Sequence, residues 1–246
     1  MIIDSLGKKI INRRNCCVIV SDFDRTLTED SSELYGPLLG VLSSLRRYEN
    51  VKFLVASGRK LDFLLKGFDL HNSPNAIVAE NGGVIYSPDI ESIHILGEQD
   101  ARIREQLKNS SIPFDAGQVV ISIRKEFEID VIKLVKGMNP SVRIEHNRDS
   151  IMILPSNVDK AHGVNEALRL MRLQPRELIC IGDAENDYSL FDIGTVSVAT
   201  YDAVPELKGR ADIVCSEKGA VGVTRFLSDL LESIHKNDEP HALDGV

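Results

Sequence analysis

Residues 16–28 form the stretch CCVIVSDFDRTLT, an apolar run that ends in two aspartates. A continuous apolar run of this length is typical of a strand that is buried on both faces, as in a parallel sheet. Asp22 and Asp24 are two residues apart, so their side chains leave the backbone on the same side and lie close together. The stretch therefore predicts a buried parallel strand with a pair of carboxylates at its carboxyl end.

Two similar runs elsewhere in the chain also end in polar residues. Val51–Ala56 precedes Ser57, and Leu178–Ile181 precedes Gly182. Two more short runs, at 76–79 and 196–199, have the same character. Between the runs, apolar residues recur at helical spacing within 35–48 and again from Val164 to Met171. Strands that alternate with helices in this way predict an open α/β sheet with right-handed crossovers.

The middle of the chain differs, because its apolar residues alternate with polar ones in stretches such as VVISIR and SIMILP. Alternation predicts an antiparallel sheet with one solvated face. We expect an inserted α+β unit over residues 84–152, flanked by a core made of 1–83 and 153–246. The elements expected within the insert are strands at 84–86, 92–96, 118–124, 142–146 and 150–154 and helices at 98–108 and 128–137.

The two neighbouring aspartates suggest chemistry. Carboxylates this close repel each other unless they share a cation or one of them is protonated. A divalent metal would let one act as a nucleophile and the other as a proton donor. An acidic turn or a helix N-cap is the structural alternative for such a pair.

Two further segments are suited to binding an anion. Ser57-Gly58-Arg59 follows a strand and enters a predicted helix, which places a hydroxyl and free backbone N–H groups at a positive helix end. Asp159 is suited to the N-cap of the next helix, which puts Lys160 in its first turn, where a cation is poorly placed unless it serves an anion. A simple cap-and-turn and a solvated surface lysine are the alternatives.

The segment GDAEND, residues 182–187, is the second strong signal. Asp183 lies at a strand end and Asp187 about one turn later, so both can face one cation. Oxygen ligands without Cys or His match Mg²⁺ rather than zinc. Together, the four segments predict an active site at the carboxyl edge of an open sheet.

In order along the chain, DxDxT, Ser, Lys and GDxxND resemble the four motifs of the haloacid dehalogenase superfamily of phosphatases. The resemblance covers nearly the whole chain and includes ENGG at 80–83 and KGAVGV at 218–223. An insert between the second and third motifs is similar to the cap of the Cof-like group, subfamily IIB, which includes sugar phosphatases and archaeal phosphoglycolate phosphatases. It implies a Rossmann-like α/β core, with the insert as a cap domain that selects the substrate.

The resemblance also implies roles for individual residues. Asp22 is expected to be the nucleophile, and Asp24 the acid and base, with its backbone carbonyl on the metal. The expected phosphate-binding residues are Ser57, Gly58, Lys160 and Asn186. The expected Mg²⁺ ligands are Asp22, Asp24, Asp183 and Asp187. Substrate contacts are expected from Arg25, Arg59 and Asn81.

Two positions depart from the family pattern. Arg25 stands where the family usually has glycine, and it is expected to project to solvent or toward the insert, or to crowd the substrate entrance. Ala161 follows Lys160 where glycine is common, which is a milder change. Neither departure removes a reacting group.

Composition excludes several classes of function. The 246 residues carry a formal charge of −8, which argues against nucleic acid or an anionic membrane as a partner. The four cysteines form no C-x-x-C pair and are expected to be core residues of a reduced, cytoplasmic protein. No signal peptide or membrane-spanning run is present in the printed sequence. Nothing in the sequence specifies an oligomeric state.

We therefore expect a Mg²⁺-dependent phosphomonoester hydrolase that acts on a small phosphorylated metabolite through an aspartyl-phosphate. Phosphoglycolate is the preferred substrate, because the insert is short and nearly balanced in charge, with 9 basic and 11 acidic residues over 84–152. A sugar-phosphate phosphatase or a phosphomutase of the same superfamily is the alternative. A non-catalytic phospho-receiver module is a remote one.

Overall fold

The computed structural model describes residues 2–11, 16–29, 33–68, 73–136 and 141–238. It contains one sheet of eight strands and a second sheet of four. In spatial order, the larger sheet consists of β12 (Ile213–Val214), β11 (Val196–Ala199), β10 (Glu177–Gly182), β1 (Cys17–Ser21), β2 (Val51–Ala56), β3 (Ala76–Ala79), β4 (Val84–Ser87) and β5 (Ser92–Ile95).

The larger sheet is parallel from β12 to β3 and antiparallel from β3 to β5. Every residue of β1, β3, β10 and β11 is buried, as their continuous apolar runs predict. The chain moves outward from β1 through β2 to β3 and later outward through β10 to β12 on the other side. The order of strands therefore reverses between β1 and β10, which is where open α/β sheets bind ligands.

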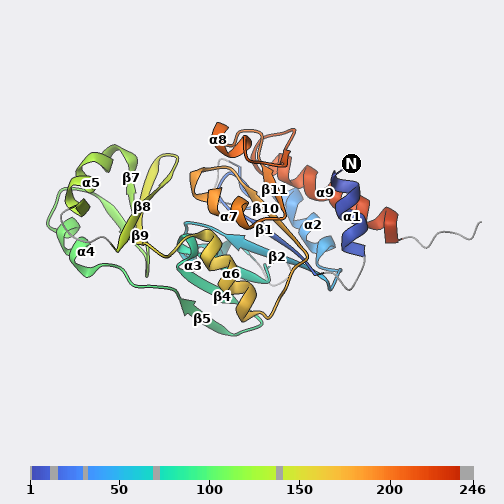
Figure 1. Cartoon of the computed structure of the whole chain (residues 1–246), viewed down its shortest axis with the longest axis horizontal. Coiled ribbons are helices and arrows are strands. Elements are labelled where there is room, and N and C mark those ends of the chain that lie inside the picture. The colour runs from blue at the N-terminus through green and yellow to red at the C-terminus, as the bar shows by residue number, and fades with distance from the viewer. Residues whose placement is uncertain (1, 12–15, 30–32, 69–72, 137–140, 239–246) are drawn as a thin grey trace, which may run out of the picture.

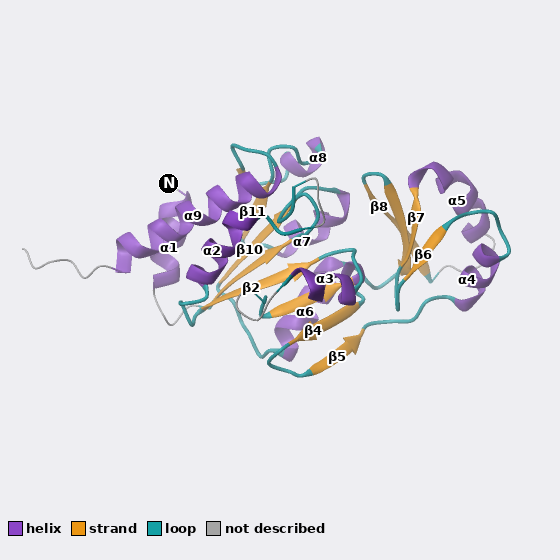
Figure 2. Ribbon diagram, turned by 180° about the vertical axis from the view of Figure 1, so that it is seen from behind, coloured by secondary structure: helices purple, strands orange, loops and turns teal. Residues whose placement is uncertain are grey.

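Helices cover both faces of the larger sheet (Figures 1 and 2). The helices on one face are α1 (Ile2–Ile11), α2 (Gly36–Leu45), α3 (Leu61–Gly67) and α9 (Gly219–Asp238). Those on the other are α6 (Lys160–Leu170), α7 (Tyr188–Ile193) and α8 (Pro205–Lys208). Alternate residues of β1 enter the two apolar clusters, Ile19 one and Val18 the other. The predicted α/β class is confirmed.

A smaller α+β unit lies at one end of the molecule (Figure 1). Its antiparallel sheet has the order β6-β7-β9-β8. We call this unit, residues 101–155, the cap. Its elements are α4 (Ala101–Lys108), β6 (Phe114–Ala116), β7 (Ile121–Arg124), α5 (Glu128–Lys136), β8 (Val142–Asn147) and β9 (Ser150–Pro155). Residue 137, expected at the end of α5, lies outside the described residues.

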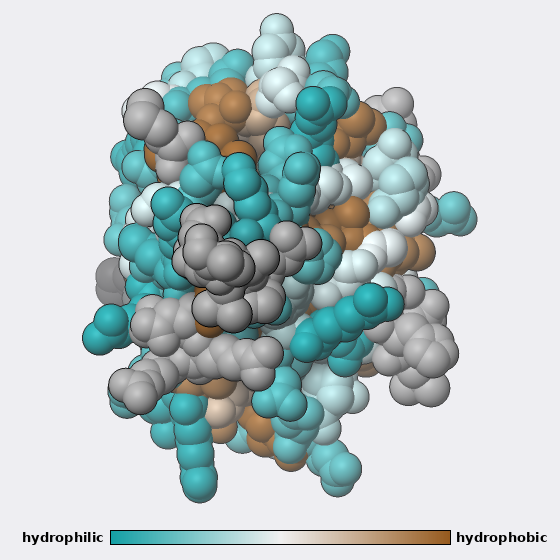
Figure 3. Space-filling view, turned by 90° about the vertical axis from the view of Figure 1, so that its right-hand side faces the viewer, coloured by the Kyte–Doolittle hydropathy of each residue, from teal (hydrophilic) through white to brown (hydrophobic). Residues whose placement is uncertain are grey.

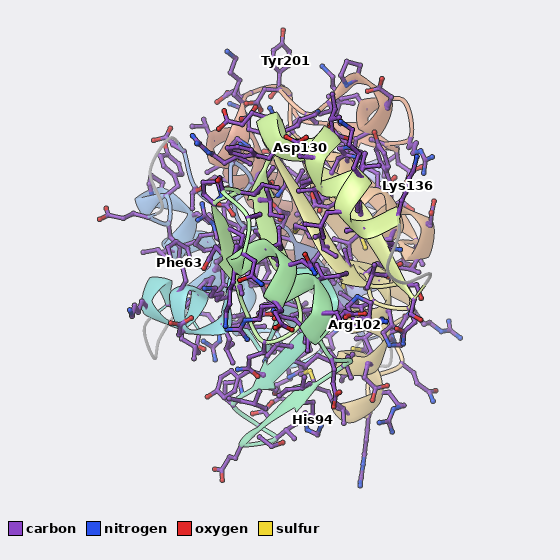
Figure 4. The ribbon with its side chains drawn as sticks, turned by 90° about the vertical axis from the view of Figure 1, so that its left-hand side faces the viewer. Phe63, His94, Arg102, Asp130, Lys136 and Tyr201 are labelled. Carbon is purple, nitrogen blue, oxygen red and sulfur yellow. The ribbon has the colours of Figure 1, made fainter. Side chains whose placement is uncertain are left out.

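The cap helices lie on the outer side of their sheet, away from the core. Viewed from the cap end, Arg102 marks α4 and Asp130 and Lys136 mark α5 in front of the strands (Figure 4). Ile103 and Val131 pack from these helices into a small apolar cluster with the strands. Asp100 caps α4 by accepting a hydrogen bond from the backbone N–H of Arg102 at 2.9 Å.

The boundary expected at residue 84 needs correction. The predicted strand pair at 84–86 and 92–96 forms as β4 and β5, but it extends the larger sheet rather than the insert. The reason is the tight turn at 80–83, which returns the chain antiparallel beside β3 with Ala79 opposite Val84. The other boundary, expected at residue 152, also shifts, because β9, expected at 150–154, belongs to the smaller sheet up to Pro155.

Other features of the surface and core bear on the sequence expectations. The described chain contains no helix that is both long and apolar enough to cross a membrane. The end of the core opposite the cap is covered largely by hydrophilic residues with apolar patches between them (Figure 3). All four cysteines are free thiols, and Cys17, Cys180 and Cys215 are buried as expected of core residues.

Candidate active site

The strand ends bring three predicted residues together. Asp22 directly follows β1, Ser57 follows β2 and Asp183 follows β10, and these strands are neighbours in the sheet. The backbone N–H of Asp22 donates to the carbonyl of Ile181 at 2.9 Å, which holds the first and last of these segments side by side. All three side chains are almost completely buried. The parallel sheet thus concentrates polar groups at one edge.

Lys160 enters this cluster from the first turn of α6. Asp159 is the N-cap of that helix and accepts from the backbone N–H of His162 at 2.7 Å, as predicted. The Nζ of Lys160 lies 2.5 Å from Oδ1 of Asp22 and 2.6 Å from Oδ1 of Asp187. Burial lowers the pKa of Lys160, but Asp187 and Asp22 together raise it above its ordinary value. The amine is therefore a buried ammonium ion that joins two aspartates.

Asp187 organises the loop that holds Asp183. Its Oδ2 accepts hydrogen bonds from the backbone N–H groups of Asp183 at 2.9 Å and Ala184 at 3.1 Å, while its Oδ1 contacts Lys160. Both of its oxygens are therefore engaged within the protein. A Cβ at Gly182 would lie 2.5 Å from Cγ of Asp187, so this close approach requires glycine.

In the two remaining aspartates of the cluster, Asp22 and Asp183, the surroundings disfavour the ionised carboxylate. Burial, and then the charge of Asp187, raises the pKa of Asp183 to about 6, although Arg148, Arg25 and Lys160 oppose the shift. Burial also raises the pKa of Asp22 well above its usual range, against the opposing effect of Lys160. Added positive charge at this place would favour the ionised form of both carboxyl groups.

The donor set suits a hard divalent cation. Asp22, Asp183 and Asp187 each offer a carboxylate oxygen, and these oxygens lie within 4.8 Å of one another. Carboxylate oxygens without sulfur or imidazole are the ligands that Mg²⁺ prefers. The cluster therefore fits a metal ion by its chemistry and by its spacing. The side chain of Asp24 lies outside this group of three, and its expected metal contact stays a prediction.

A cavity of about 580 Å³ opens beside the cluster, between the core and the cap. Asp24 lines it together with Arg59, whose Nε and Nη2 bind Asp24 in a forked arrangement at 2.8 to 3.1 Å. The guanidinium of Arg59 also lies 4.8 Å from the ring centroid of Phe63 on α3. The cap contributes Ser122, Arg124, Asn147, Asp149, Ser150 and Met152 to the same walls. Both units therefore shape this cavity.

Ser57 and Gly58 form the turn below the cavity. The Oγ of the fully buried Ser57 accepts from the backbone N–H of Arg59 at 3.1 Å. Gly58 lines the cavity, and a Cβ there would lie 3.2 Å from the sulfur of Met152 in the cap. The cap approaches the core closely at this point. The predicted phosphate contacts of both residues stay predictions.

The side chain of Arg25 is partly exposed and reaches toward Asp183. Its Nε lies 3.3 Å from Oδ2 of Asp183, and it also lines the cavity. Its backbone has φ of 59°, a left-handed conformation that glycine adopts without strain. This conformation explains why glycine is usual at the corresponding position of the family that the sequence resembles. Arg25 adopts the same conformation and adds a positive charge.

Asn81 and Asn186 meet behind the cavity. The Nδ2 of Asn186 donates to Oδ1 of Asn81 at 3.1 Å, and both side chains are buried. Neither residue is part of the cavity wall. The structure therefore places this pair as a bridge between the loops after β3 and β10, and their expected substrate and phosphate contacts are not tested by it.

Sequence reasoning assigned no role to Glu80, Thr26 or Arg148. The buried carboxylate of Glu80 accepts backbone hydrogen bonds from residues 118, 119 and 120 at 2.7 to 3.1 Å. Thr26 donates to Oδ1 of Asp183 at 3.4 Å, and Nη2 of Arg148 lies 2.6 Å from Oδ2. Thr26 and Glu80 stand within the quoted motifs. Arg148 has no local signal, because its partners lie in a distant segment.

Comparison with known proteins identifies the family of this chain. Residues 98–227 match the family of haloacid dehalogenase-like hydrolases. The chain is 33% identical over 223 residues to a phosphoglycolate phosphatase of Sulfurisphaera tokodaii, covering 87% of this chain and 94% of the relative.

Solved structures have the same fold at lower sequence identity. A Thermoplasma acidophilum protein has a TM-score of 0.75 at 17% identity, covering 88% of this chain and 98% of its own. A sugar phosphatase of haloacid dehalogenase subclass IIB has a TM-score of 0.71 at 15% identity, covering 86% and 98%. The chain therefore belongs to the haloacid dehalogenase-like hydrolases, as a phosphatase of that family.

Proposed function

We propose that this phosphatase hydrolyses phosphoglycolate, with Mg²⁺ as cofactor and an aspartyl-phosphate on Asp22 as intermediate. The observation that carries the proposal is the buried contact of Asp22 with Lys160, which itself contacts Asp187. A carboxylate beside a fixed ammonium ion can approach a phosphoryl group whose negative oxygens the ammonium attracts.

In the proposed first step, Oδ of Asp22 attacks phosphorus in line with the leaving oxygen. The P–O bond to the alcohol breaks, and Asp24 gives its proton to the departing oxygen. Arg59 orients Asp24 toward the cavity through its forked contact. Lys160 and the hydroxyl of Ser57 hold the phosphoryl oxygens.

In the proposed second step, Asp24 removes a proton from a water molecule, whose oxygen attacks the phosphorus of the aspartyl-phosphate. The bond to Asp22 breaks, inorganic phosphate leaves and the carboxylate is restored. Mg²⁺ held by Asp22 and Asp183, with support from Asp187, would supply positive charge to the phosphoryl oxygens. Asp187 keeps Lys160 and the backbone of Asp183 in position throughout.

Phosphoglycolate is preferred because relatives such as the Sulfurisphaera tokodaii enzyme, which aligns over 94% of its length, are phosphoglycolate phosphatases. A sugar phosphate is the second candidate, since a cavity of about 580 Å³ has room for a molecule of that size. Nothing in the described residues marks a second phosphate site of the kind that a phosphomutase needs. Membership in a family of hydrolases argues against a non-catalytic phospho-receiver module.

The test is phosphate release from phosphoglycolate, several hexose phosphates and p-nitrophenyl phosphate, each with Mg²⁺ and with EDTA. We expect kcat/KM to be highest for phosphoglycolate and activity to disappear in EDTA and return with Mg²⁺. Ca²⁺ should bind but support little turnover, because its looser coordination misplaces the phosphoryl group. Full activity in EDTA would contradict the proposed dependence on Mg²⁺. A higher kcat/KM for hexose phosphates would contradict the proposal that phosphoglycolate is the substrate.

A further inference from the structure

The turn between β8 and β9 carries a side chain that reaches from the cap into residues 183–187 of the core. We call this segment the metal-binding loop, because it holds two of the proposed Mg²⁺ ligands. Arg148 lies in this turn with a left-handed backbone, φ being 47°. Its Nη2 lies 2.6 Å from Oδ2 of Asp183 and donates to the carbonyls of Asp183 at 3.3 Å and Asp202 at 2.9 Å. Its backbone N–H donates to the carboxylate of Glu185 at 3.0 Å. One residue thus makes four polar contacts with two core loops.

These contacts hold a wall of the cavity. Asn147, Asp149 and Ser150, the neighbours of Arg148, line the cavity. β8 also packs against the short 3₁₀ helix Glu185–Asp187, which belongs to the metal-binding loop. A shift of this turn would therefore move the guanidinium group of Arg148 away from Asp183.

The same guanidinium competes with a cation. Asp183 is 1% exposed, and its Oδ2 already faces both Arg148 and Arg25. A divalent ion bound by Asp183 would have to share that carboxylate with a guanidinium group a few ångströms away. Two positive charges at such a distance repel strongly in a partly desolvated site. The contact of Arg148 with Oδ2 of Asp183 is therefore the one that a cation bound there would weaken.

We propose that Arg148 is a latch between the cap and the metal-binding loop, and that it competes with Mg²⁺ for Asp183. Mg²⁺ binding loosens the β8–β9 turn, and docking of the turn weakens Mg²⁺ binding to the same extent, because such coupling is reciprocal. Arg148 is a positioning residue that acts through Asp183. The inference rests on the proposed function, since it takes Asp183 as a Mg²⁺ ligand.

The first experiment measures Mg²⁺ affinity by calorimetric titration without substrate. The proteins are the wild type, Arg148→Gln, Arg148→Lys, Asp183→Asn and a control, Arg143→Gln. Arg143 is a matched arginine on β8, but it pairs with Glu145 and Asp159 instead of Asp183. We expect Arg148→Gln to bind Mg²⁺ at least about fivefold more tightly than the wild type, a typical size for coupling between sites.

The other variants make that result specific. Arg148→Lys keeps the positive charge but lacks the planar guanidinium group, so its Mg²⁺ affinity should lie between those of the wild type and Arg148→Gln. Arg143→Gln should stay within about twofold of the wild type, and Asp183→Asn should bind Mg²⁺ far more weakly. A merely structural role for Arg148 would not tighten Mg²⁺ binding when the residue is removed.

The second experiment follows amide hydrogen exchange of residues 147–150, in the wild type first, so that its main result does not depend on the folding of a variant. Mg²⁺ should speed exchange in this turn, and it should have no such effect in Asp183→Asn. Slower exchange with Mg²⁺, or equal or weaker Mg²⁺ binding by Arg148→Gln, overturns the latch. If Mg²⁺ binds the wild type and Asp183→Asn equally, or binds neither, the metal site of the proposed function fails as well.

Discussion

The catalytic edge of the larger sheet and the cap are built in opposite ways. At the catalytic edge, Asp22, Lys160, Asp183 and Asp187 are buried and bound to one another or to neighbouring backbone. In the cap, every residue of β8 is only partly buried, and the apolar cluster has eight buried residues. Buried charges restrict each other to one geometry, whereas a thin unit with a small core depends on its attachments.

The described attachments of the cap to the core are both apolar and polar. Val119, Val120, Met152 and Leu154 of the cap belong to the apolar cluster of the core. Glu80 binds the backbone at 118–120, Lys60 pairs with Asp115, and Arg148 reaches Asp183. The core and the cap are therefore expected to respond differently to substitution, because charged pairs dominate one and packing against a neighbouring unit supports the other. Changes at the catalytic edge should therefore abolish chemistry, and changes at the attachments should alter stability or substrate contacts.

Replacement of the nucleophile should have the largest effect. Asp22→Asn removes the attacking carboxylate and should lower kcat by at least about 10³-fold, equivalent to about 4 kcal/mol. The fold should survive, because the amide keeps the shape and relieves one buried negative charge. The measurement is kcat on p-nitrophenyl phosphate together with the thermal midpoint. A variant that keeps more than about a tenth of wild-type kcat would exclude Asp22 as the nucleophile.

Loss of the Glu80 attachment should be the next largest effect. Glu80→Ala leaves three backbone N–H groups, two of them buried, without their acceptor and should lower the free energy of unfolding by about 3 kcal/mol. Glu80→Gln keeps one acceptor oxygen and should cost about 1 kcal/mol. Urea unfolding measures both, with the exposed Glu126 as control, where Glu126→Ala should change stability by less than about 0.5 kcal/mol. If Glu80→Ala and Glu126→Ala lowered the free energy of unfolding equally, the hydrogen bonds of Glu80 would not stabilise the cap.

The raised pKa of Asp183, about 6, predicts a pH effect on the stability of the metal-free protein. A carboxyl group with a raised pKa holds its proton more tightly when folded. Its stabilising contribution is therefore full below its unfolded pKa of about 3.9 and is lost as the pH rises through about 6. The loss should be on the order of 2 kcal/mol.

The measurement is urea unfolding in EDTA from about pH 4.5 to about pH 7 for the wild type and Asp183→Asn. The wild type should lose stability relative to the variant over this interval, because the amide side chain of the variant cannot ionise. If the free energy of unfolding changed with pH in the same way in both proteins, the pKa of Asp183 would not be raised by folding. Added Mg²⁺ should offset the loss in the wild type alone, since the ion favours the ionised carboxylate.

The smallest effect is expected at the exposed attachment. Nζ of Lys60 lies 2.5 Å from Oδ1 of Asp115, whose side chain is 71% exposed. Solvent screens such a pair, so Asp115→Asn should change the free energy of unfolding by less than about 1 kcal/mol, and less at high salt. The same urea assay at two salt concentrations checks this. A loss as large as that of Glu80→Ala would mean that the cap is held mainly at its surface.

The sequence by itself determined which polar residues gather at the carboxyl edge of the larger sheet. Three of the apolar runs lie directly before Asp22, Ser57 and the Gly182-Asp183 pair, so the grouping of these residues follows from the geometry of a parallel sheet. The N-cap at Asp159 likewise placed Lys160 in the first turn of its helix. Local patterns suffice there, because the periodicity of strands and helices is set by near neighbours.

Only the tertiary structure decided how the cap is joined to the core. The pairing of β4 and β5 with β3 moved the boundary of the insert, since the same alternating pattern suits a strand of either sheet. Arg148 and Asp183 are 35 residues apart, and Glu80 and Val119 are 39 apart. Contacts across such separations depend on how whole elements pack, and no short stretch of sequence encodes them.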